Sequence, residues 1–321
     1  MPRVPRDAKK GDIVIWIGSV YFNHKLLKEL KRLGLVTILY QTEPLPMIMM
    51  NMTNQNILWG NDKKYDRRLK TEKHDNNGNE DDTVVFGETL VLTLKNCKSY
   101  SRNWDPSIYD EIWDYGKSHT DAINACRSKQ NSSIIPRARY VPSGYLEKWP
   151  HSPDFQQDRS DHVVFLGSLK HGRQKCWNAL LKSPVLKDRL KPVYDLWNEA
   201  AFQNFTEHYP YNKMFISFHK YCEFPRLKES VAALEPRAAI IMSTKGLLIS
   251  DRCYAGDEAE WEGLLDFVEL GEMEKVYLRM MNLSLSDRQR LVEERFEKFK
   301  IKFSPKAILE RARIPSWLAK S

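Results

Sequence analysis

One short pattern opens each half of this chain and limits the folds open to it. A run of apolar residues ends at a glycine, and a segment with helical spacing follows. The run covers residues 12–18 (DIVIWIG) in the first half and 162–169 (HVVFLGSL) in the second. Such runs are typical of strands that are buried on both faces of a parallel sheet. The chain is therefore predicted to be α/β, with a parallel sheet in each half.

The first half continues as a β-α-β unit. Residues 26–34 have helical spacing and stop at Gly34, and residues 35–40 form a second apolar run. The crossover between two such parallel strands is expected to be right-handed. Further strands are predicted at 83–86, 89–94, 111–115 and 138–142, with a helix at 118–127.

The second half repeats the alternation and ends in helices. Ser286, with Gln289 three residues later, predicts a capping box that opens a helix to about residue 302. Ser304 followed by Pro305 predicts the start of another helix. The remaining predictions are strands at 193–197, 213–219 and 246–250, and helices at 173–181 and 226–235.

Length and local composition predict two domains. At about 150 residues per domain, 321 residues suggest two. Prolines and a glycine among polar neighbours at 142–161 have the composition of a linker. We therefore predict a first domain over 1–145, a linker over 146–160 and a second domain over 161–321. Residues 71–82 contain no apolar side chain, which predicts a flexible surface insertion within about 60–82.

No segment of the sequence predicts membrane insertion, secretion or a metal knuckle. The chain lacks an apolar window of about 18 residues, and its basic start is not followed by a signal-peptide core. We therefore expect a cytoplasmic protein. The cysteines lie far apart, without a CxxC pair or a Cys/His cluster, so reduced thiols are expected rather than a disulfide framework or a zinc site. They are Cys97, Cys126, Cys176, Cys222 and Cys253.

The net charge of +8 is concentrated near the end of the chain. From Ser286 onward there are 10 basic and 5 acidic residues. A basic helix of this kind is usually a solvated face. Two other interpretations stay open: weak association with anionic surfaces through the basic C-terminus, and binding of nucleic acid.

Chemistry-bearing residues follow the predicted strands. Parallel α/β domains bind ligands at the carboxyl ends of their strands, and this rule selects the candidates. In the first half they are His24, Asp114 and His119. In the second half they are Gly167, Ser168, Arg173, His219, Lys220, Glu229, Glu235, Arg237, Asp251 and Arg252.

The loop at Gly167 is a candidate anion site. A glycine there lets backbone N–H groups approach an anion at a helix N-terminus. Four cationic side chains could neutralise a pyrophosphate without a metal. Neither GxGxxG nor GxxxxGKS occurs, which disfavours Rossmann dehydrogenases and P-loop NTPases. The four cations are Arg173, Lys220, Arg237 and Arg252.

The order of these segments resembles a known family. The second half resembles the C-terminal donor-binding domain of GT-B glycosyltransferases, within the short group similar to glycosyl transferases group 1. The segments that carry the resemblance are 163–169 with Arg173, 218–220, 234–237 and 245–252 (KGLLISDR). Residues 112–115 and 139–145 resemble that group's approach to its interdomain linker, so the likeness covers roughly 111–318.

The resemblance implies two Rossmann-like domains whose parallel sheets face each other across a cleft, with C-terminal helices. It implies transfer of a sugar from a nucleotide sugar, bound by the second domain, to a hydroxyl acceptor on a glycan or another molecule, bound by the first. The Gly167 loop and Arg173 would lie near the diphosphate, and Glu235 would bind donor hydroxyls. The larger families place seven residues between two glutamates, whereas Glu229 and Glu235 have five between them and Leu227 occupies the earlier position.

The expected reaction uses no cofactor besides the nucleotide sugar. No Asp-x-Asp triplet occurs to hold manganese, so metal-independent transfer is expected, with basic groups stabilising the leaving diphosphate. An inverting reaction needs a general base, and His24, His119 and Asp114 are the first-domain candidates. The sequence does not choose among them, and the two histidines are better interpreted as solvated side chains. The alternative is a non-catalytic nucleic-acid-binding or interaction module on the same fold.

Overall fold

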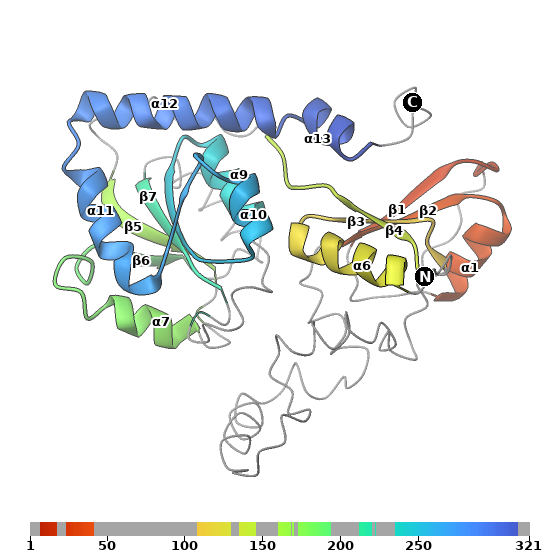
Figure 1. The fold of residues 1–321 in the computed structure, drawn as a ribbon, viewed down its shortest axis with the longest axis horizontal. Helices are drawn as coiled ribbons and strands as arrows, with labels where there is room; N and C mark the ends of the chain where they lie inside the picture. Colours follow the sequence, from red (N-terminus) through yellow and green to blue (C-terminus); the bar gives the residue numbers. More distant parts are fainter. Residues whose placement is uncertain are drawn as a thin grey trace, which may run out of the picture. The chain divides into compact units, whose positions relative to one another are not determined.

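The computed structural model describes residues 7–17, 24–41, 108–129, 135–145, 160–167, 169, 173–193, 212–219, 222 and 235–313. The chain divides into two compact units, Met1–Val141 and Pro142–Ser321 (Figure 1). Each unit contains a parallel sheet with helices, so the predicted α/β class is confirmed.

The described strands of the first unit form a parallel sheet in sequence order, β1-β2-β3-β4. Leu39 of β2 lies opposite Trp16 of β1 and Ile112 of β3. The strands are β1 (Ile13–Ile17), β2 (Val36–Gln41), β3 (Glu111–Asp114) and β4 (Arg137–Tyr140), and the helices are α1 (His24–Arg32) and α6 (Lys117–Lys129). The strands predicted at 83–86 and 89–94 lie outside the described residues.

The core of the first unit is apolar and comes from both helices and the inner strands. Leu27 and Leu30, three residues apart on α1, point to the same side and are almost fully buried. They pack with Leu39, Ile112 and Ile123. Burial of these side chains, rather than helix propensity alone, holds the short helix α1 against the sheet.

The prediction that the first strand is buried on both faces is wrong. Ile15 is 44% exposed and Ile17 is 71% exposed, whereas Val14 and Trp16 pack against the core. Among the described strands β1 lies at one edge of the sheet, and alternate side chains of a strand point to opposite faces. Val14 and Trp16 therefore face the core, and Ile15 and Ile17 point away from it.

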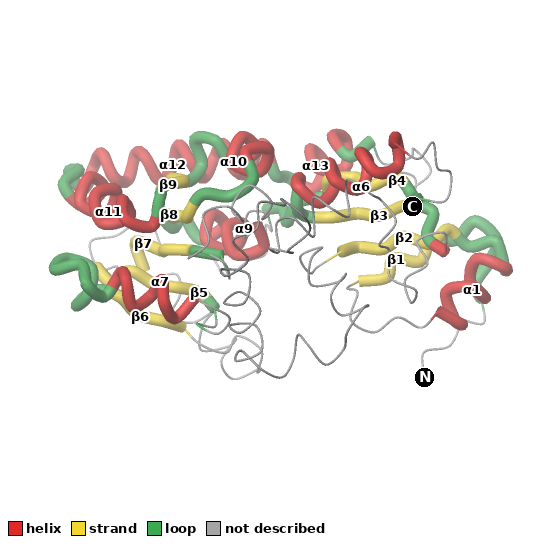
Figure 2. Tube along the Cα trace, turned by 60° about the horizontal axis from the view of Figure 1, so that its bottom comes forward, coloured by secondary structure: helices red, strands yellow, loops and turns green. Residues whose placement is uncertain are grey.

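The described strands of the second unit form a five-stranded parallel sheet in the order β6-β5-β7-β8-β9, which can be followed in Figure 2. β5 lies between β6 and β7 in the sheet, so the carboxyl ends of β5 and β7 lie side by side although they are far apart in sequence. The strands are β5 (Ser160–Leu166), β6 (Leu190–Val193), β7 (Asn212–Ser217), β8 (Leu247–Asp251) and β9 (Asp266–Val268). The helices are α7 (Arg173–Leu180), α9 (Glu235–Ser243), α10 (Ala255–Glu260), α11 (Met273–Met281), α12 (Leu285–Lys302) and α13 (Pro305–Arg311).

Most of the described elements of the second unit were predicted, but some were missed. All five residues of β8 are buried, as a central strand of a parallel sheet requires. β6 covers Leu190–Val193, and its start was not predicted because Lys191 and Pro192 interrupt the apolar pattern. The strand predicted at 193–197 lies, apart from Val193, outside the described residues. β9, with only three residues, has no apolar run from which to predict it.

The C-terminal helices are fixed by caps and aromatic packing. α12 is capped by Ser284, whose Oγ accepts a hydrogen bond from Asp287 N at 3.1 Å, and not by Ser286 as predicted. Ser304 caps α13, with Pro305 at its first turn, as predicted. The Trp261 ring stacks on Phe303 with centroids 4.4 Å apart, and both side chains are fully buried. Among the described residues, no helix is both long and apolar enough to cross a membrane.

Two cysteines of the second unit form a disulfide, contrary to the expectation of reduced thiols. Cys176 of α7 and Cys222 are 46 residues apart in sequence, with Cα atoms 6.4 Å apart. Both lie in the core cluster that includes Phe165, Met214 and Phe218. Sequence spacing does not show this pairing, because the fold brings α7 beside the end of β7.

Candidate functional site

The predicted strand-end residues of the second unit lie on adjacent strands. β5, β7 and β8 are neighbours in the sheet, and Ser217 at the end of β7 pairs with Ser250 of β8. Gly167 follows β5, His219 follows β7, and Asp251 ends β8. All three therefore occupy the carboxyl edge of one parallel sheet, where α/β domains bind ligands.

Gly167 has a backbone conformation that disfavours other residues, and an arginine side chain lies against it. Its φ is +129°, in the range that L side chains rarely adopt. A Cβ atom there would lie 2.8 Å from Nη2 of Arg237, in the first turn of α9. The structure therefore places an arginine guanidinium directly against the glycine backbone. Guanidinium groups and exposed backbone N–H groups are the donors that bind phosphate oxygens.

His219 and Asp251 form a buried pair next to this glycine-containing edge. His219 is 2% exposed and Asp251 is fully buried. The His219 backbone N–H donates to Asp251 Oδ2 at 3.1 Å, and its Nε2 lies 3.4 Å from Asp251 Oδ1. The carboxylate thus fixes the backbone of His219 through a hydrogen bond and lies close to its ring. Protonation of the imidazole would convert this close approach into an ion pair.

Arg173 connects α7 to the same strand end. Its side chain is 4% exposed, and Nε donates a hydrogen bond to the carbonyl oxygen of Phe218 at 3.3 Å. Phe218 itself stacks on Phe165 of β5, with ring centroids 4.3 Å apart. The carbonyl group of Phe218 therefore holds Arg173 beside His219, and the stacking of Phe218 on Phe165 fixes the position of that carbonyl group.

Arg252 does not join this cluster. Its side chain is 48% exposed, and Nη1 lies 2.7 Å from Glu258 Oε2. Glu258 Oε1 also accepts a hydrogen bond from Cys253 N at 2.8 Å. Arg252 and Glu258 thus brace the turn between β8 and α10. Several other predicted residues are outside the described part of the chain: Ser168, Lys220 and Glu229, and the side chains of His24 and Glu235.

In the first unit, the structure brings Asp114 and His119 together. Asp114 ends β3, and His119 lies in the first turns of α6. Asp114 Oδ1 lies 2.9 Å from His119 Nδ1 and accepts a hydrogen bond from Gly116 N at 2.7 Å. Tyr115 contacts the imidazole edge to face, with centroids 6.0 Å apart.

The interpretation of His119 as a solvated side chain is wrong. His119 is 1% exposed and Asp114 is fully buried. Burial raises the pKa of Asp114 above its ordinary value, and the charge and hydrogen bond of His119 oppose that rise. The sequence of α6 is largely polar, so it gives little sign that this histidine faces inward.

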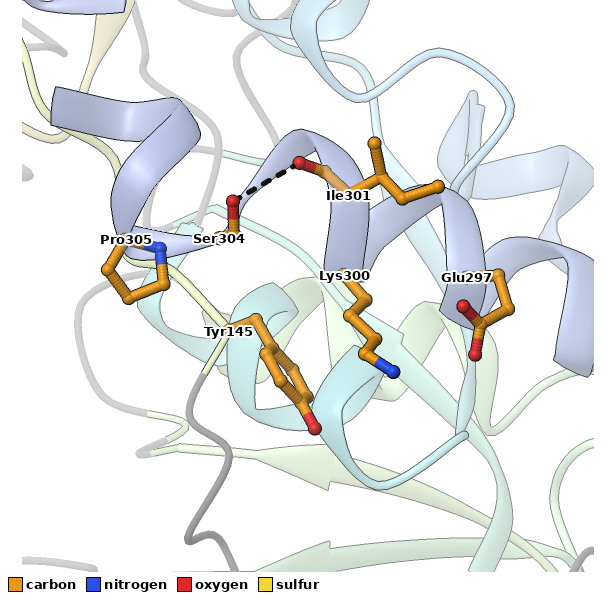
Figure 3. Close-up of a pocket in the computed structure, with 6 residues that line it drawn as sticks. All are labelled: Tyr145, Glu297, Lys300, Ile301, Ser304 and Pro305. Carbon is orange, nitrogen blue, oxygen red and sulfur yellow. Dashed lines mark hydrogen bonds between the residues drawn. The ribbon is translucent and has the colours of Figure 1, made fainter. Parts of the chain in front are cut away.

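A separate groove of about 480 Å³ lies at the junction of α12 and α13 (Figure 3). Figure 3 shows the Tyr145 ring and the Lys300 side chain extending into it from different segments. None of the predicted site residues lines this groove. Its lining residues are Tyr145, Glu297, Lys300, Ile301, Ser304 and Pro305.

The basic C-terminal segment uses much of its charge inside the second unit. Arg288 is buried and donates to the carbonyl oxygens of Met280 and Met281. Arg295 is bound to Asp266 at 2.7 Å. Lys302 and Arg311 both lie within 4 Å of Glu260. Within the described residues, no group of three His, Cys, Asp or Glu side chains is arranged to hold a metal ion.

Comparison with known proteins gives structural likenesses only. No protein-family model matches the sequence, and no curated protein matches it. The structure of an alpha,alpha-trehalose-phosphate synthase (UDP-forming) from Burkholderia vietnamiensis is similar over 92% of this chain and 71% of its own, at 10% identity and a TM-score of 0.46.

Two other solved structures are similar over most of this chain. The pneumococcal O-GlcNAc transferase GtfA, in complex with UDP and GlcNAc, aligns with 97% of it and 56% of GtfA, at 11% identity and a TM-score of 0.48. WaaG, a glycosyltransferase involved in lipopolysaccharide biosynthesis, aligns with 93% of it and 99% of WaaG, at 10% identity and a TM-score of 0.44. Identities this low do not decide what this chain binds.

Proposed function

We propose that this chain is a glycosyltransferase that moves a sugar from a nucleotide-sugar donor to a hydroxyl acceptor, with the donor bound by the second unit. The observation that carries the proposal is the guanidinium of Arg237 against the Gly167 backbone at the carboxyl edge of the sheet. The same edge carries Arg173 and the His219–Asp251 pair. This arrangement suits a diphosphate better than an uncharged ligand.

Charge stabilisation at this edge is the chemical contribution of the second unit. When the glycosidic bond to the nucleotide breaks, negative charge develops on the diphosphate. Arg237 and Arg173 are oriented before the reaction, so they can stabilise that charge without reorganisation. Metal-independent transfer follows as a part of this proposal, and the absence of an Asp-x-Asp triplet supports it.

Activation of the acceptor hydroxyl is assigned to His119. Its Nδ1 faces Asp114, so the carboxylate favours the tautomer with hydrogen on Nδ1 and leaves Nε2 as the basic atom. Asp114 itself is fully buried, and its Oδ1 accepts a hydrogen bond from Gly116 N and contacts His119, which suits an orienting role. His24 remains a second candidate for the base.

The alternative, a nucleic-acid-binding module without catalysis, receives less support. That reading depended on the positive charge near the C-terminus. In the structure, Arg288, Arg295, Lys302 and Arg311 are engaged by carbonyl or carboxylate groups of the same unit. Fewer cations are therefore left for phosphates of an external chain. Weak association with anionic surfaces is proposed only for exposed residues such as Lys298 and Lys300.

The proposal is tested by calorimetric binding of a panel of nucleoside diphosphates, with and without excess EDTA. We expect one member to bind and Arg237→Ala to weaken its binding about tenfold or more, because a charge-assisted hydrogen bond contributes about 1.5–3 kcal/mol. Arg252→Ala is the matched control, since Arg252 is exposed and paired with Glu258. Equal loss in both variants, or binding that requires manganese, would contradict the proposal.

Turnover is measured separately with the nucleotide sugar whose diphosphate binds. Release of the nucleoside diphosphate should continue in EDTA and should fall in Arg237→Ala. The anomeric configuration of the product, read by NMR, shows whether the reaction inverts and therefore whether a general base is needed.

A further inference from the structure

The disulfide between Cys176 and Cys222 lies next to the strand-end cluster. Cys176 is three residues after Arg173 on α7, so the two side chains lie on the same side of that helix. Cys222 is three residues after His219. Both sulfur-bearing residues are buried, with 2% and 6% exposure.

The contacts around the disulfide form a closed ring through the cluster. Cys222 N donates to His219 O at 3.3 Å, and Arg173 Nε donates to Phe218 O at 3.3 Å. The disulfide joins Cys222 to Cys176, and Cys176 belongs to the same helix as Arg173, which closes the ring. The positions of Arg173 and His219 are therefore coupled through a covalent bond.

The hydrogen bonds of this ring are weak compared with its covalent link. Both are 3.3 Å long, just beyond the usual range of about 2.7–3.2 Å for N–H···O bonds. Without the disulfide, α7 and the segment after β7 would be joined by noncovalent contacts alone, and these two long hydrogen bonds are among them. Noncovalent contacts can open locally without unfolding of the whole protein.

We propose that Cys176 and Cys222 are a redox-sensitive pair that controls the anion site: the disulfide holds Arg173 and His219 in place, and reduction loosens both. This inference rests on the proposed function of the strand-end cluster. A dithiol reduces the pair when one of its thiolates attacks a cysteine sulfur, which releases the other cysteine as a thiolate. The second thiolate of the reagent then attacks the reagent's own sulfur in the mixed disulfide, which breaks the bond to the first cysteine and releases it as a thiolate. Two electrons and two protons thus pass to the cysteines, and the reagent leaves as a cyclic disulfide.

Reoxidation by a small disulfide such as oxidised glutathione reverses the same steps. Because both cysteines are buried, exchange requires local opening of α7 or of the segment that carries Cys222. Cys253, which is buried after β8 and keeps its thiol, provides a matched control that lies outside the ring.

The first test needs no ligand. Mass spectrometry of alkylated protein should show that Cys176 and Cys222 are linked in the oxidised form and separate after dithiothreitol. Hydrogen exchange at the amides of His219 and Cys222 should become at least tenfold faster on reduction, while exchange in α12 should not change. Unchanged exchange at both amides, or loss of protection throughout the unit, would overturn the proposal.

The second test measures binding of inorganic pyrophosphate to the full chain. Reduction should weaken binding about tenfold, Cys176→Ala/Cys222→Ala should bind as weakly in either buffer, and Cys253→Ser should respond to reduction as the unsubstituted chain does. Equal affinity for pyrophosphate in the oxidised and reduced forms would overturn the proposal that the disulfide controls anion binding. If pyrophosphate and all nucleoside diphosphates fail to bind, the proposed function fails, while hydrogen exchange still decides whether the disulfide holds His219.

Discussion

The Nη2 atom of Arg237 lies 2.8 Å from the position that a Cβ atom would take on Gly167, so the guanidinium occupies the space of the missing side chain. Two segments about 70 residues apart in sequence meet at this point. The φ of +129° is the reason that a glycine is required, and a side chain at this position would in addition displace the end of the flexible Arg237 side chain.

Gly167→Ala should therefore lose both stability and ligand binding. Adoption of an unfavourable φ costs about 1–3 kcal/mol, and displacement of Arg237 should weaken diphosphate binding about tenfold or more. Thermal unfolding and calorimetry measure the two effects. Gly263→Ala is the control, because Gly263 also has a positive φ (+75°) but no atom within 4 Å of its added Cβ. If both variants keep full binding, Arg237 is not placed by this contact.

Asp251→Ala should disorder His219 and destabilise the second unit. The substitution removes the acceptor of the His219 N–H and leaves that buried donor without its partner. Loss of a buried carboxylate that binds a backbone amide costs about 3 kcal/mol. Denaturant unfolding measures this cost, and the NMR signal of the His219 ring should broaden or shift. A cost below about 1 kcal/mol would show that the carboxylate is not essential for the strand end.

Asp114→Asn tests the pKa shift in the first unit. Because burial raises the pKa of Asp114 in the folded protein, this residue favours folding most below its unfolded pKa near 4, and that contribution is lost as pH rises through the folded pKa. The free energy of unfolding of the unsubstituted chain, minus that of Asp114→Asn, should decrease from pH 3.5 to pH 7.5. A difference that increases with pH would mean that attraction to His119 outweighs burial.

The candidate edge of the second sheet was predictable, because strand ends can be read from apolar runs that stop at polar residues. Gly167, His219 and Asp251 each follow or end such a run, and the rule for parallel sheets places them together. The sequence did not show that Arg237 covers Gly167 or that Arg252 turns to Glu258. Those side-chain directions depend on packing rather than on local pattern.

Other features depend on contacts between distant residues. The Cys176–Cys222 disulfide spans 46 residues, and no spacing rule predicts it. His119 is buried because α6 places the imidazole against Asp114 at the end of β3. The helix has little apolar periodicity from which this could be predicted. Ile15 and Ile17 are exposed because they lie on the face of β1 opposite to Val14 and Trp16, which pack on the core, and the apolar run alone does not reveal this.

Glu235 gives a prediction that separates donor recognition from folding. It is the first residue of α9, two positions before Arg237, and the resemblance to GT-B glycosyltransferases implies that it binds donor hydroxyls. Such a carboxylate contributes about 1.5–3 kcal/mol, so Glu235→Gln should lower turnover roughly 10- to 100-fold. The melting temperature should hardly change, and the affinity for the nucleoside diphosphate alone should be retained, because the sugar hydroxyls are absent from that ligand.

Three measurements on Glu235→Gln distinguish the outcomes: turnover, melting temperature and diphosphate affinity. Unchanged turnover would remove Glu235 from the donor site. A fall in melting temperature with a matching fall in activity would identify a structural role at the start of α9. Weaker binding of the diphosphate itself would show that the substitution acts through Arg237, since the two residues share the first turn of one helix. Only loss of turnover with the other two unchanged supports contact with the sugar.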